Sequence, residues 1–432
     1  MNVLMFGWEF PPNISGGLGT ACFGIVKGLS SCADVKVAFV VPKAYGNEPS
    51  TTIQLISADN IFIENDTLFT ESSPSLRTLE VSSRLVPYLT PESFAEKYQS
   101  SIEIQKKSTN EIVKEGRKIN FSGKYGQDLF EEIYNYAIVA ETIAQNNEFE
   151  IIHAHDWLTF PAAIAAKRIS GKPLVVHIHS TDFDRSGGSV NQAIYDIEKN
   201  GMEEADQIIT VSNRIKHRLT EQYNIPAKKI TTVYNAIDPN FYRALPEIKK
   251  KSKQKTVTFL GRITIQKGPE YFVEVARMVI NRIKNVHFVM AGNGELRNRI
   301  VELCAHYHIS DRFHFTGFLE SDEVTEMLYK SDIFIMPSVS EPFGIVPLEA
   351  MLAHVPVIIS KQSGVSELIM NVIKTDFWDV HAMADAVYNI LKHKTLANAM
   401  MTEGKTEVSK LNWELAAIQI RQVYFQTIRQ AS

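Results

Sequence analysis

The sequence predicts an α/β protein with two doubly wound domains, each built on a parallel β-sheet covered by helices on both faces. The chain has 432 residues, a length that favours two domains over one. Short apolar runs alternate with segments of helical spacing along nearly the whole chain. The runs are too apolar for a sheet with one face in water, so parallel, buried strands are expected.

The apolar runs that predict strands occur in both halves of the chain. In order, they are "NVLMFGW", "VKVAFVVP", "EIIHAHD", "PLVVHIHS", "DQIITVS", "KITTVYNAI", "TVTFLGR", "VHFVMAG", "RFHFTG", "DIFIMPS" and "VPVIISK". Apolar residues at helical spacing predict helices at 128–146, 158–168, 269–284, 294–307 and 381–393.

The clearest domain boundary lies at 239–255, "PNFYRALPEIKKKSKQK", where prolines and clustered lysines replace any strand pattern. We interpret it as a solvated linker, because runs of like charge rarely pack. The N-terminal domain is then expected over 1–238 and the C-terminal domain over 256–411. Residues 85–127 form a polar excursion on the first domain, and residues 412–432 form an amphipathic helix.

Composition excludes several function classes. The chain carries 45 basic and 49 acidic residues, a formal charge of −4, which argues against a nucleic-acid binder. No apolar run approaches the roughly 18 residues of a membrane span, and the start "MNVLMFGWEF" lacks the features of a secretory signal. The scattered Cys22, Cys32 and Cys304 are expected to be reduced, as in a cytoplasmic protein.

The loop "GWEFPPNISGGLG" follows the first strand and places Gly16, Gly17 and Gly19 where a helix is expected to begin, near Leu18. Exposed N–H groups at such a junction favour an anion. The same glycines would equally suit a tight turn. The spacing is not the G-x-G-x-x-G fingerprint, so a dinucleotide cofactor is not indicated.

A second polar site is predicted in "VTFLGRITIQKGPEYF". Arg262 and Lys267 follow the first strand of the second domain, and Pro269 opens the next helix. Two cations beside a helix N-terminus suit a diphosphate, with Arg262 offering a forked contact and Lys267 a point charge.

Two carboxylates follow the strand "DIFIMPS" in the segment "VSEPFGIVPLEAM". Gly344 is expected at the helix start, so that Glu341 lies in the loop and Glu349 about one turn into the helix. Carboxylates in these positions can accept hydrogen bonds from sugar hydroxyls.

The motifs "HAHDW" and "HIHSTDFDR" each end a strand, and the two histidines of each motif share a face. A metallo-hydrolase pattern H-x-H-x-D-H would need aspartate and histidine where this chain has Trp157 and Leu158. We therefore expect no metal here and interpret these histidines as core or active-site polar groups. G-x-S-x-G and Walker motifs are absent, which excludes serine hydrolases and P-loop proteins.

Taken together, "FPPNISGGLG", "IIHAHDWLT", "GRITIQKG", "EPFGIVPLEAM" and "LNWELAAIQIRQVY" resemble the retaining glycosyltransferases of the glycogen/starch-synthase type and their family-4 relatives. The resemblance covers nearly the whole chain in the right order. It implies a GT-B fold, in which two Rossmann-like domains face each other across an active-site cleft and the last helix crosses back to the first domain.

The resemblance implies roles for the C-terminal domain in donor binding. Arg262 and Lys267 would hold the donor diphosphate and stabilise it as it leaves. Glu341 would bind hydroxyls of the transferred sugar, and Glu349 would bind the ribose. Backbone N–H groups near the sugar would come from Phe343, Gly344 and Ile345, and the loop around Phe318 would flank the base.

The N-terminal domain would mainly take the acceptor. By the same resemblance, His179 would lie beside the anomeric carbon and Asp156 would line the acceptor side. Gly16 and Gly17 would let backbone amides approach the donor phosphate or sugar. Members of this fold usually need no metal ion, so the nucleotide sugar is expected as co-substrate with no cofactor. Retention is attributed to same-face attack assisted by the leaving phosphate.

One departure concerns Ile14. The ADP-glucose-dependent synthases of the family carry a lysine two residues before the paired glycines, and here that position is Ile14. The missing cation weakens the case for ADP-glucose and leaves UDP-glucose or another nucleoside diphosphate hexose open.

We therefore expect a cytoplasmic glucosyltransferase that extends an α-glucan from UDP- or ADP-glucose. Three alternatives stay open: the same chemistry on a lipid-linked, polysaccharide or small-molecule acceptor, a nucleotide-sugar epimerase, and a non-catalytic sugar-binding protein. The Glu341–Glu349 signature favours transfer over epimerisation. A leaving-group clamp of Arg262 and Lys267 would be superfluous for binding alone.

Overall fold

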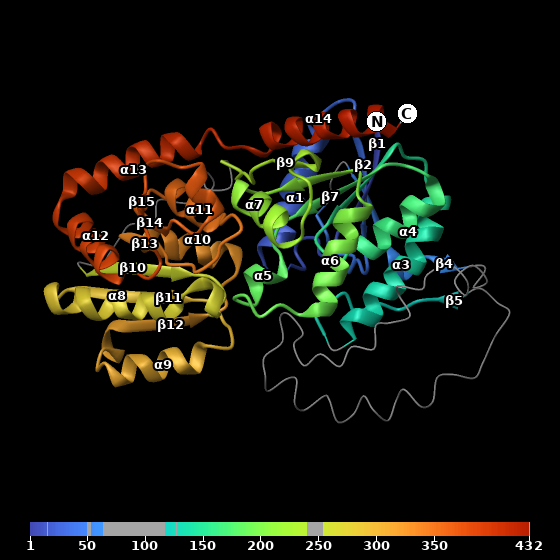
Figure 1. Ribbon diagram of the computed structural model, residues 1–432. Helices are drawn as coiled ribbons and strands as arrows, with labels where there is room; N and C mark the ends of the chain where they lie inside the picture. Colours follow the sequence, from blue (N-terminus) through green and yellow to red (C-terminus); the bar gives the residue numbers. More distant parts are fainter. Residues whose placement is uncertain (15, 50–52, 64–116, 127, 240–253, 432) are drawn as a thin grey trace, which may run out of the picture. The chain divides into compact units, whose positions relative to one another are not determined.

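The computed structural model divides into two compact units (Figure 1). Unit 1 comprises Met1–Val211, Ile215–Tyr234 and Glu414–Ser432, and unit 2 comprises Ser212–Arg214 and Asn235–Trp413. The described residues are 1–14, 16–49, 53–63, 117–126, 128–239 and 254–431. Most of the predicted excursion at 85–127 and of the predicted linker at 239–255 lies outside them.

Unit 1 is built on a seven-stranded sheet in the order β3-β2-β1-β6-β7-β8-β9, and every strand pair is parallel. Its strands are β1 (Asn2–Phe6), β2 (Lys36–Val41), β3 (Gln54–Ser57), β6 (Ile151–His155), β7 (Leu174–Ile178), β8 (Gln207–Thr210) and β9 (Ile230–Thr232). A separate antiparallel pair joins β4 (Phe62–Ile63) to β5 (Arg117–Lys118).

Helices accompany the strands of this sheet. They are α1 (Gly17–Ser30), α3 (Leu129–Gln145), α4 (Phe160–Ser170), α5 (Asp182–Arg185), α6 (Gln192–Glu204), α7 (Asn213–Gln222) and α14 (Trp413–Ala431), with 3-10 turns at η1 (Ala58–Asn60) and η3 (Ala227–Lys229). Local sequence sets several of their ends. The side chain of Asn191 caps α6, and Gly171 ends α4 in the left-handed conformation.

The last helix, α14, belongs to unit 1 although unit 2 precedes it in the chain. Arg421 of α14 forms a bidentate ion pair with Asp34, and the Tyr424 hydroxyl lies 2.6 Å from His153 Nδ1. Unit 1 therefore contains segments from before and after unit 2 in the sequence.

Unit 2 contains a six-stranded parallel sheet in the order β12-β11-β10-β13-β14-β15. The strands are β10 (Lys255–Leu260), β11 (Val286–Ala291), β12 (Phe313–Gly317), β13 (Ile333–Met336), β14 (Val357–Ser360) and β15 (Ile373–Thr375). The helices are α8 (Pro269–Arg282), α9 (Arg297–His306), α10 (Ser321–Lys330), α11 (Val346–Leu352), α12 (Val380–Lys392) and α13 (Lys394–Val408), with 3-10 turns η4 (Ile265–Lys267), η5 (Ser310–Arg312) and η6 (Gly364–Glu367).

In each sheet the strand order reverses at one point, between β1 and β6 in unit 1 and between β10 and β13 in unit 2. Connections leave the two central strands in opposite directions there, and in open parallel sheets ligands bind at the carboxyl ends of such strands. The structure confirms the predicted α/β class with two doubly wound sheets. All eleven predicted runs contain a strand, and the predicted helices correspond to α3, α4, α8, α9 and α12.

Candidate functional site

Unit 2 brings Lys267 and Glu341 together at the carboxyl ends of β10 and β13. Lys267 ends the turn η4, and its Nζ donates to Glu341 Oε2. The Glu341 side chain is 8% exposed, and the Ser338 hydroxyl donates to the same Oε2 at 3.4 Å. The pair places an ammonium and a buried carboxylate at the switch point of the sheet. A ligand with both phosphate and hydroxyl groups would find complementary partners there.

The loop that carries Glu341 is held by backbone hydrogen bonds on two sides. The Val339 N–H donates to the Gln266 carbonyl at 2.9 Å, which ties the loop to η4. The Glu341 N–H donates to the Gln362 carbonyl, and the Gly364 N–H donates to the Glu341 carbonyl, both at 2.9 Å. Glu341 therefore has a fixed backbone before any ligand arrives, a form of preorganisation.

The residues after Glu341 lead directly into α11. Phe343 is buried, Gly344 has φ +101°, and Ile345 precedes the first helical residue. A Cβ on Gly344 would lie 3.1 Å from Glu341 Cγ, so the turn is tight against the carboxylate side chain. Glu349 is the fourth residue of α11 and is partly buried, and burial raises the pKa of its carboxyl to about 7.

Arg262 and Phe318 lie at the same carboxyl edge of this sheet. Arg262 follows Gly261 directly after β10, and Phe318 follows β12 with 66% of its surface exposed. The ends of β10 and β11 approach so closely that a Cβ on Gly292 would lie 2.0 Å from the Gly261 carbonyl oxygen. The predicted donor residues of the second domain thus gather around one edge.

In unit 1, the glycines of the opening loop differ in whether neighbouring atoms leave room for a side chain. Gly16 has an extended φ of −178°, Gly17 begins α1, and a Cβ on either would meet no described atom within 4 Å. A Cβ on Gly19, by contrast, would lie 2.4 Å from Ile14 Cγ2. Packing within the described part of the chain therefore explains Gly19 and leaves open space beside Gly16 and Gly17.

This contrast gives a prediction. Gly19→Ala is expected to lower the free energy of unfolding by about 1–3 kcal/mol, because its methyl group would overlap Ile14. Gly17→Ala should stay within about 0.5 kcal/mol of the parent. If the space beside Gly17 admits the donor, Gly17→Ala will raise the donor KM about tenfold. Urea denaturation and initial rates measure the two effects. Unchanged kinetics in Gly17→Ala would exclude that glycine from donor binding.

Asp156 and His179 meet at the carboxyl ends of the neighbouring strands β6 and β7. Asp156 adopts φ +59°, and its Oδ1 accepts hydrogen bonds from the N–H groups of His179 at 2.6 Å and Ser180 at 3.3 Å. His179 Nε2 lies 3.0 Å from His155 Nδ1. Burial raises the pKa of Asp156 to about 7 and lowers the pKa of His179 to about 3, so His179 is neutral. Asp156 thus fixes the backbone that carries the predicted anomeric histidine.

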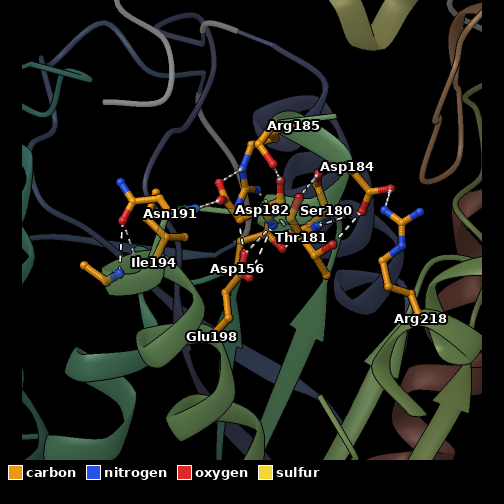
Figure 2. Close-up of polar contacts among 12 residues, drawn as sticks. Asp156, Ser180, Thr181, Asp182, Asp184, Arg185, Asn191, Ile194, Glu198 and Arg218 are labelled. Carbon is orange, nitrogen blue, oxygen red and sulfur yellow. Dashed lines mark hydrogen bonds and ion pairs between the residues drawn. The ribbon is translucent and has the colours of Figure 1, made fainter. Parts of the chain in front are cut away.

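A network of buried carboxylates supports the segment after β7 (Figure 2). Arg185 lies between Glu198 of α6, at 2.7 Å, and Asp182, at 3.8 Å. Arg218 of α7 pairs with Asp184 at 2.5 Å. Burial raises the pKa of Glu198 to about 7, against the lowering effect of Arg185. The network ties α5 to α6 and α7, and so fixes the chain beyond His179.

Sequence reasoning missed Ser338, Glu198 and Arg218. Ser338 is the last residue of the run "DIFIMPS" and lies just beyond the end of β13, a position where site residues are expected, so this signal could have found it. Glu198 and Arg218 lie within helices α6 and α7, and nothing in their spacing marks them.

Among the described residues of unit 1, two groups have the residue types and proximity to hold a metal ion. They are His153, His155 and His177, and Cys22 with His155 and His179; within each group the ligand atoms lie within 4.8 Å of one another. The prediction that these histidines are core or active-site groups did not anticipate such convergence.

Among the described residues, no helix combines the length and the apolar character needed to cross a membrane.

Comparison with known proteins assigns both halves of the chain. Residues 243–407 match the family model of the group 1 glycosyl transferases, and residues 106–241 match glycosyltransferase family 4. An uncharacterized glycosyltransferase of Methanocaldococcus jannaschii is 27% identical, with 98% of each chain covered. The glycogen synthase of Mycobacterium tuberculosis is 24% identical over 98% of this chain and 94% of that protein.

Solved structures share the fold. HepE of Anabaena, solved in complex with UDP-glucose, superposes with a TM-score of 0.68 at 16% identity, with 99% of this chain and 100% of that chain covered. At this identity the likeness shows the fold, and it confirms the predicted GT-B class.

Proposed function

Because its two halves match group 1 and family 4, the chain is a glycosyltransferase, and we propose that it transfers glucose from UDP-glucose to an α-glucan with retention of configuration. The reaction class rests on the family. The donor, acceptor and stereochemistry are the proposal. The full-length similarity to a glycogen synthase supports a glucan acceptor.

The contact between Lys267 and Glu341 carries the proposal. In the absence of donor the two charges neutralise each other. With donor bound, the Lys267 ammonium would turn to the diphosphate, together with Arg262, and Glu341 would accept hydrogen bonds from the sugar hydroxyls. A sugar diphosphate therefore replaces one internal ion pair by two sets of charge-assisted contacts.

Further residues have supporting roles in this proposal. N–H groups of Phe343, Gly344 and Ile345 would face the sugar, Glu349 would bind the ribose, and Phe318 would flank the uracil. His179 would lie beside the anomeric carbon, with its backbone held by Asp156. Gly16 and Gly17 would leave room for the donor, which fits the open space around both.

The transfer itself breaks the bond between the anomeric carbon and the diphosphate oxygen. The acceptor hydroxyl attacks the same face and passes its proton to the departing phosphate, so no protein nucleophile is consumed. Arg262 and Lys267 would stabilise the negative charge that develops on the diphosphate. We propose that this step needs no metal ion, since two cations supply the stabilisation.

The environment of Ile14 favours UDP-glucose over ADP-glucose in this proposal. Ile14 replaces the lysine expected of ADP-glucose-dependent synthases, and it packs against the backbone of Gly19. Its side chain is part of the loop packing rather than a charge aimed at a ligand.

A donor-by-acceptor screen tests the function. The full chain would be offered UDP-, ADP- and GDP-sugars with and without glycogen, with nucleoside diphosphate release as the readout. UDP-glucose is expected to turn over fastest, and glycogen to accelerate release. Release that no α-glucan accelerates would reject the acceptor, and release with ADP-glucose alone would reject the donor. Product anomer analysis by NMR tests retention.

The raised pKa of Glu349 gives a pH prediction. Its carboxyl titrates near pH 7, so it is protonated below and ionised above that value. Only the ionised form accepts hydrogen bonds at both oxygens, so the donor KM is expected to fall as the pH rises from about 6 to about 8. Glu349→Gln should flatten this dependence. An unchanged pH profile in the variant would remove Glu349 from donor binding.

A further inference from the structure

Four histidines gather on β6 and β7 in the interior of unit 1. His153 and His155 lie two residues apart on β6, and His155 is the cross-strand partner of His177 on β7. The rings of His153 and His155 lie 4.3 Å apart between centroids, and His177 lies 5.4 Å from each. His179 adjoins the group, 4.4 Å from His177. All four are buried.

Most of the ring nitrogens in this histidine cluster lack a partner among the described residues. The unpartnered buried atoms are His153 Nε2, His155 Nε2, both nitrogens of His177, and His179 Nδ1. A buried polar atom without a partner costs about 1–3 kcal/mol. Several such atoms in one place are unusual, and a bound ion is one of the few things that would satisfy them.

The remaining nitrogens are arranged as metal-binding histidines require. His153 Nδ1 lies 2.6 Å from the Tyr424 hydroxyl, and His155 Nδ1 lies 3.0 Å from His179 Nε2. When a histidine binds a metal through one nitrogen, the other nitrogen usually donates to a neighbouring group, which fixes the ring and its tautomer. In the tautomer that carries the hydrogen on Nδ1 of His153 and of His155, both Nε2 lone pairs would be available to an ion.

We propose that His153, His155 and His177 bind one transition-metal ion of the zinc type through their ring nitrogens, at a site that adjoins His179 and does not include it. Their candidate ligand atoms lie within 4.8 Å of one another. Zinc–nitrogen bonds of about 2.0–2.1 Å would draw them closer by side-chain rotation. Imidazole is a ligand that zinc, cobalt, nickel and copper share.

The surroundings favour this all-histidine set over the overlapping set of Cys22, His155 and His179. The neighbouring Tyr424 hydroxyl, 2.6 Å from His153 Nδ1, orients the His153 ring within the all-histidine set. The overlapping set would require the thiolate form of Cys22, which is a buried residue. The all-histidine set does not include His179, which the proposed function places beside the anomeric carbon.

The ion would act on stability. It would join β6 to β7, and through Tyr424 it would also support α14, which returns to unit 1 from the far end of the chain. An ion bound only by the folded protein raises the free energy of unfolding. The wild-type protein is therefore expected to melt at a higher temperature with Zn²⁺ than after removal of metal by a chelator.

Metal content tests the proposal. The full chain, with any affinity tag removed, would be stripped with a chelator, incubated with Zn²⁺ or Co²⁺, desalted and analysed by plasma mass spectrometry. One ion per chain is expected, together with the visible absorption of Co²⁺ in a nitrogen site. His177→Asn should lose the ion, whereas His217→Asn, which changes an exposed histidine of α7, should keep it.

If His177→Asn fails to fold, two variants that each remove only one hydroxyl group can test the proposal. Tyr424→Phe removes only the hydroxyl beside His153 and is expected to weaken metal affinity about 10- to 100-fold. Tyr136→Phe is its matched control, because Tyr136 is also buried in unit 1 but bonds to the carbonyls of Gly7 and Val40. Equal affinities in the two variants would overturn the proposal.

Two other results would also overturn it. One is a wild-type chain that retains no ion after reconstitution. The other is an ion lost in Cys22→Ser but kept in His177→Asn, which would place the metal on the other set. None of these readouts depends on sugar transfer, so failure of the proposed function would leave them unchanged.

Discussion

Alanine in place of Lys267 is expected to slow sugar transfer by about 100- to 1,000-fold, the usual effect of removing one preorganised group that stabilises developing charge. The departing diphosphate gains negative charge as the glycosyl bond breaks, and the Lys267 ammonium is positioned at the switch point of unit 2. Because this charge is larger in the transition state than in the bound donor, kcat should fall more than the donor KM rises.

Steady-state rates of nucleoside diphosphate release, with donor and acceptor varied separately, measure the effect. Lys330→Ala is the matched control, since Lys330 of α10 also pairs with a carboxylate in unit 2, that of Glu326, but both of these side chains are exposed. It should leave both constants unchanged. A Lys267→Ala enzyme within about threefold of the parent in kcat would contradict the assignment.

The same substitution also has a structural effect that must be separated from catalysis. Without Lys267, the buried Glu341 carboxylate loses its counter-charge, which destabilises the fold by up to about 3 kcal/mol. The double variant Lys267→Ala/Glu341→Ala removes both charges and should recover part of that stability. It should recover none of the activity, because both predicted donor contacts are gone. Recovery of transfer in the double variant would show that Lys267 acts only by neutralising Glu341.

Much of the fold was predictable because strands buried on both faces are apolar along almost their whole length. β6 and β7 read as unbroken apolar runs apart from their histidines, and all residues of both are buried. The predictions missed β3 and β15, which are edge strands of four and three residues, "QLIS" and "IKT". Edge strands bury less surface, so few apolar residues mark them.

The sequence predicted that the candidate residues would lie at one sheet edge, but it did not predict the contacts between them. Lys267 and Glu341 follow strands that prove to be neighbours, so position alone placed them at one edge. Their direct ion pair joins residues 74 positions apart, and no periodicity links such distant side chains. The same holds for the carboxylate of Asp156, which the resemblance placed on the acceptor side and which binds the backbone of His179 and Ser180.

Gly268→Ala is expected to lower the stability of unit 2 by about 2–5 kcal/mol and to abolish most transfer. Gly268 separates Lys267 from α8 and adopts φ +66°, where an alanine costs roughly 1–2 kcal/mol. A Cβ there would lie 2.2 Å from the Pro337 carbonyl oxygen, at the end of β13. The Pro337 carbonyl and the Cβ are both fixed to the backbone, so a side-chain rotation cannot remove the clash. The turn η4 would have to move away from β13, at a further cost of about 1–3 kcal/mol.

Gly317→Ala separates the cost of the left-handed backbone from the cost of the steric clash. Gly317 also has a left-handed backbone, with φ +75°, but the nearest described atom to its added Cβ would be Asn293 Oδ1, at 3.9 Å. It should show only the backbone cost. Hydrogen exchange of peptides from β10 and β13 measures the opening free energy within the intact chain. A displaced η4 would carry Lys267 away from Glu341, so Gly268→Ala should lose activity as Lys267→Ala does although every charged side chain remains. Equal protection in the two glycine variants would mean that the approach of Gly268 to Pro337 does not set the position of Lys267.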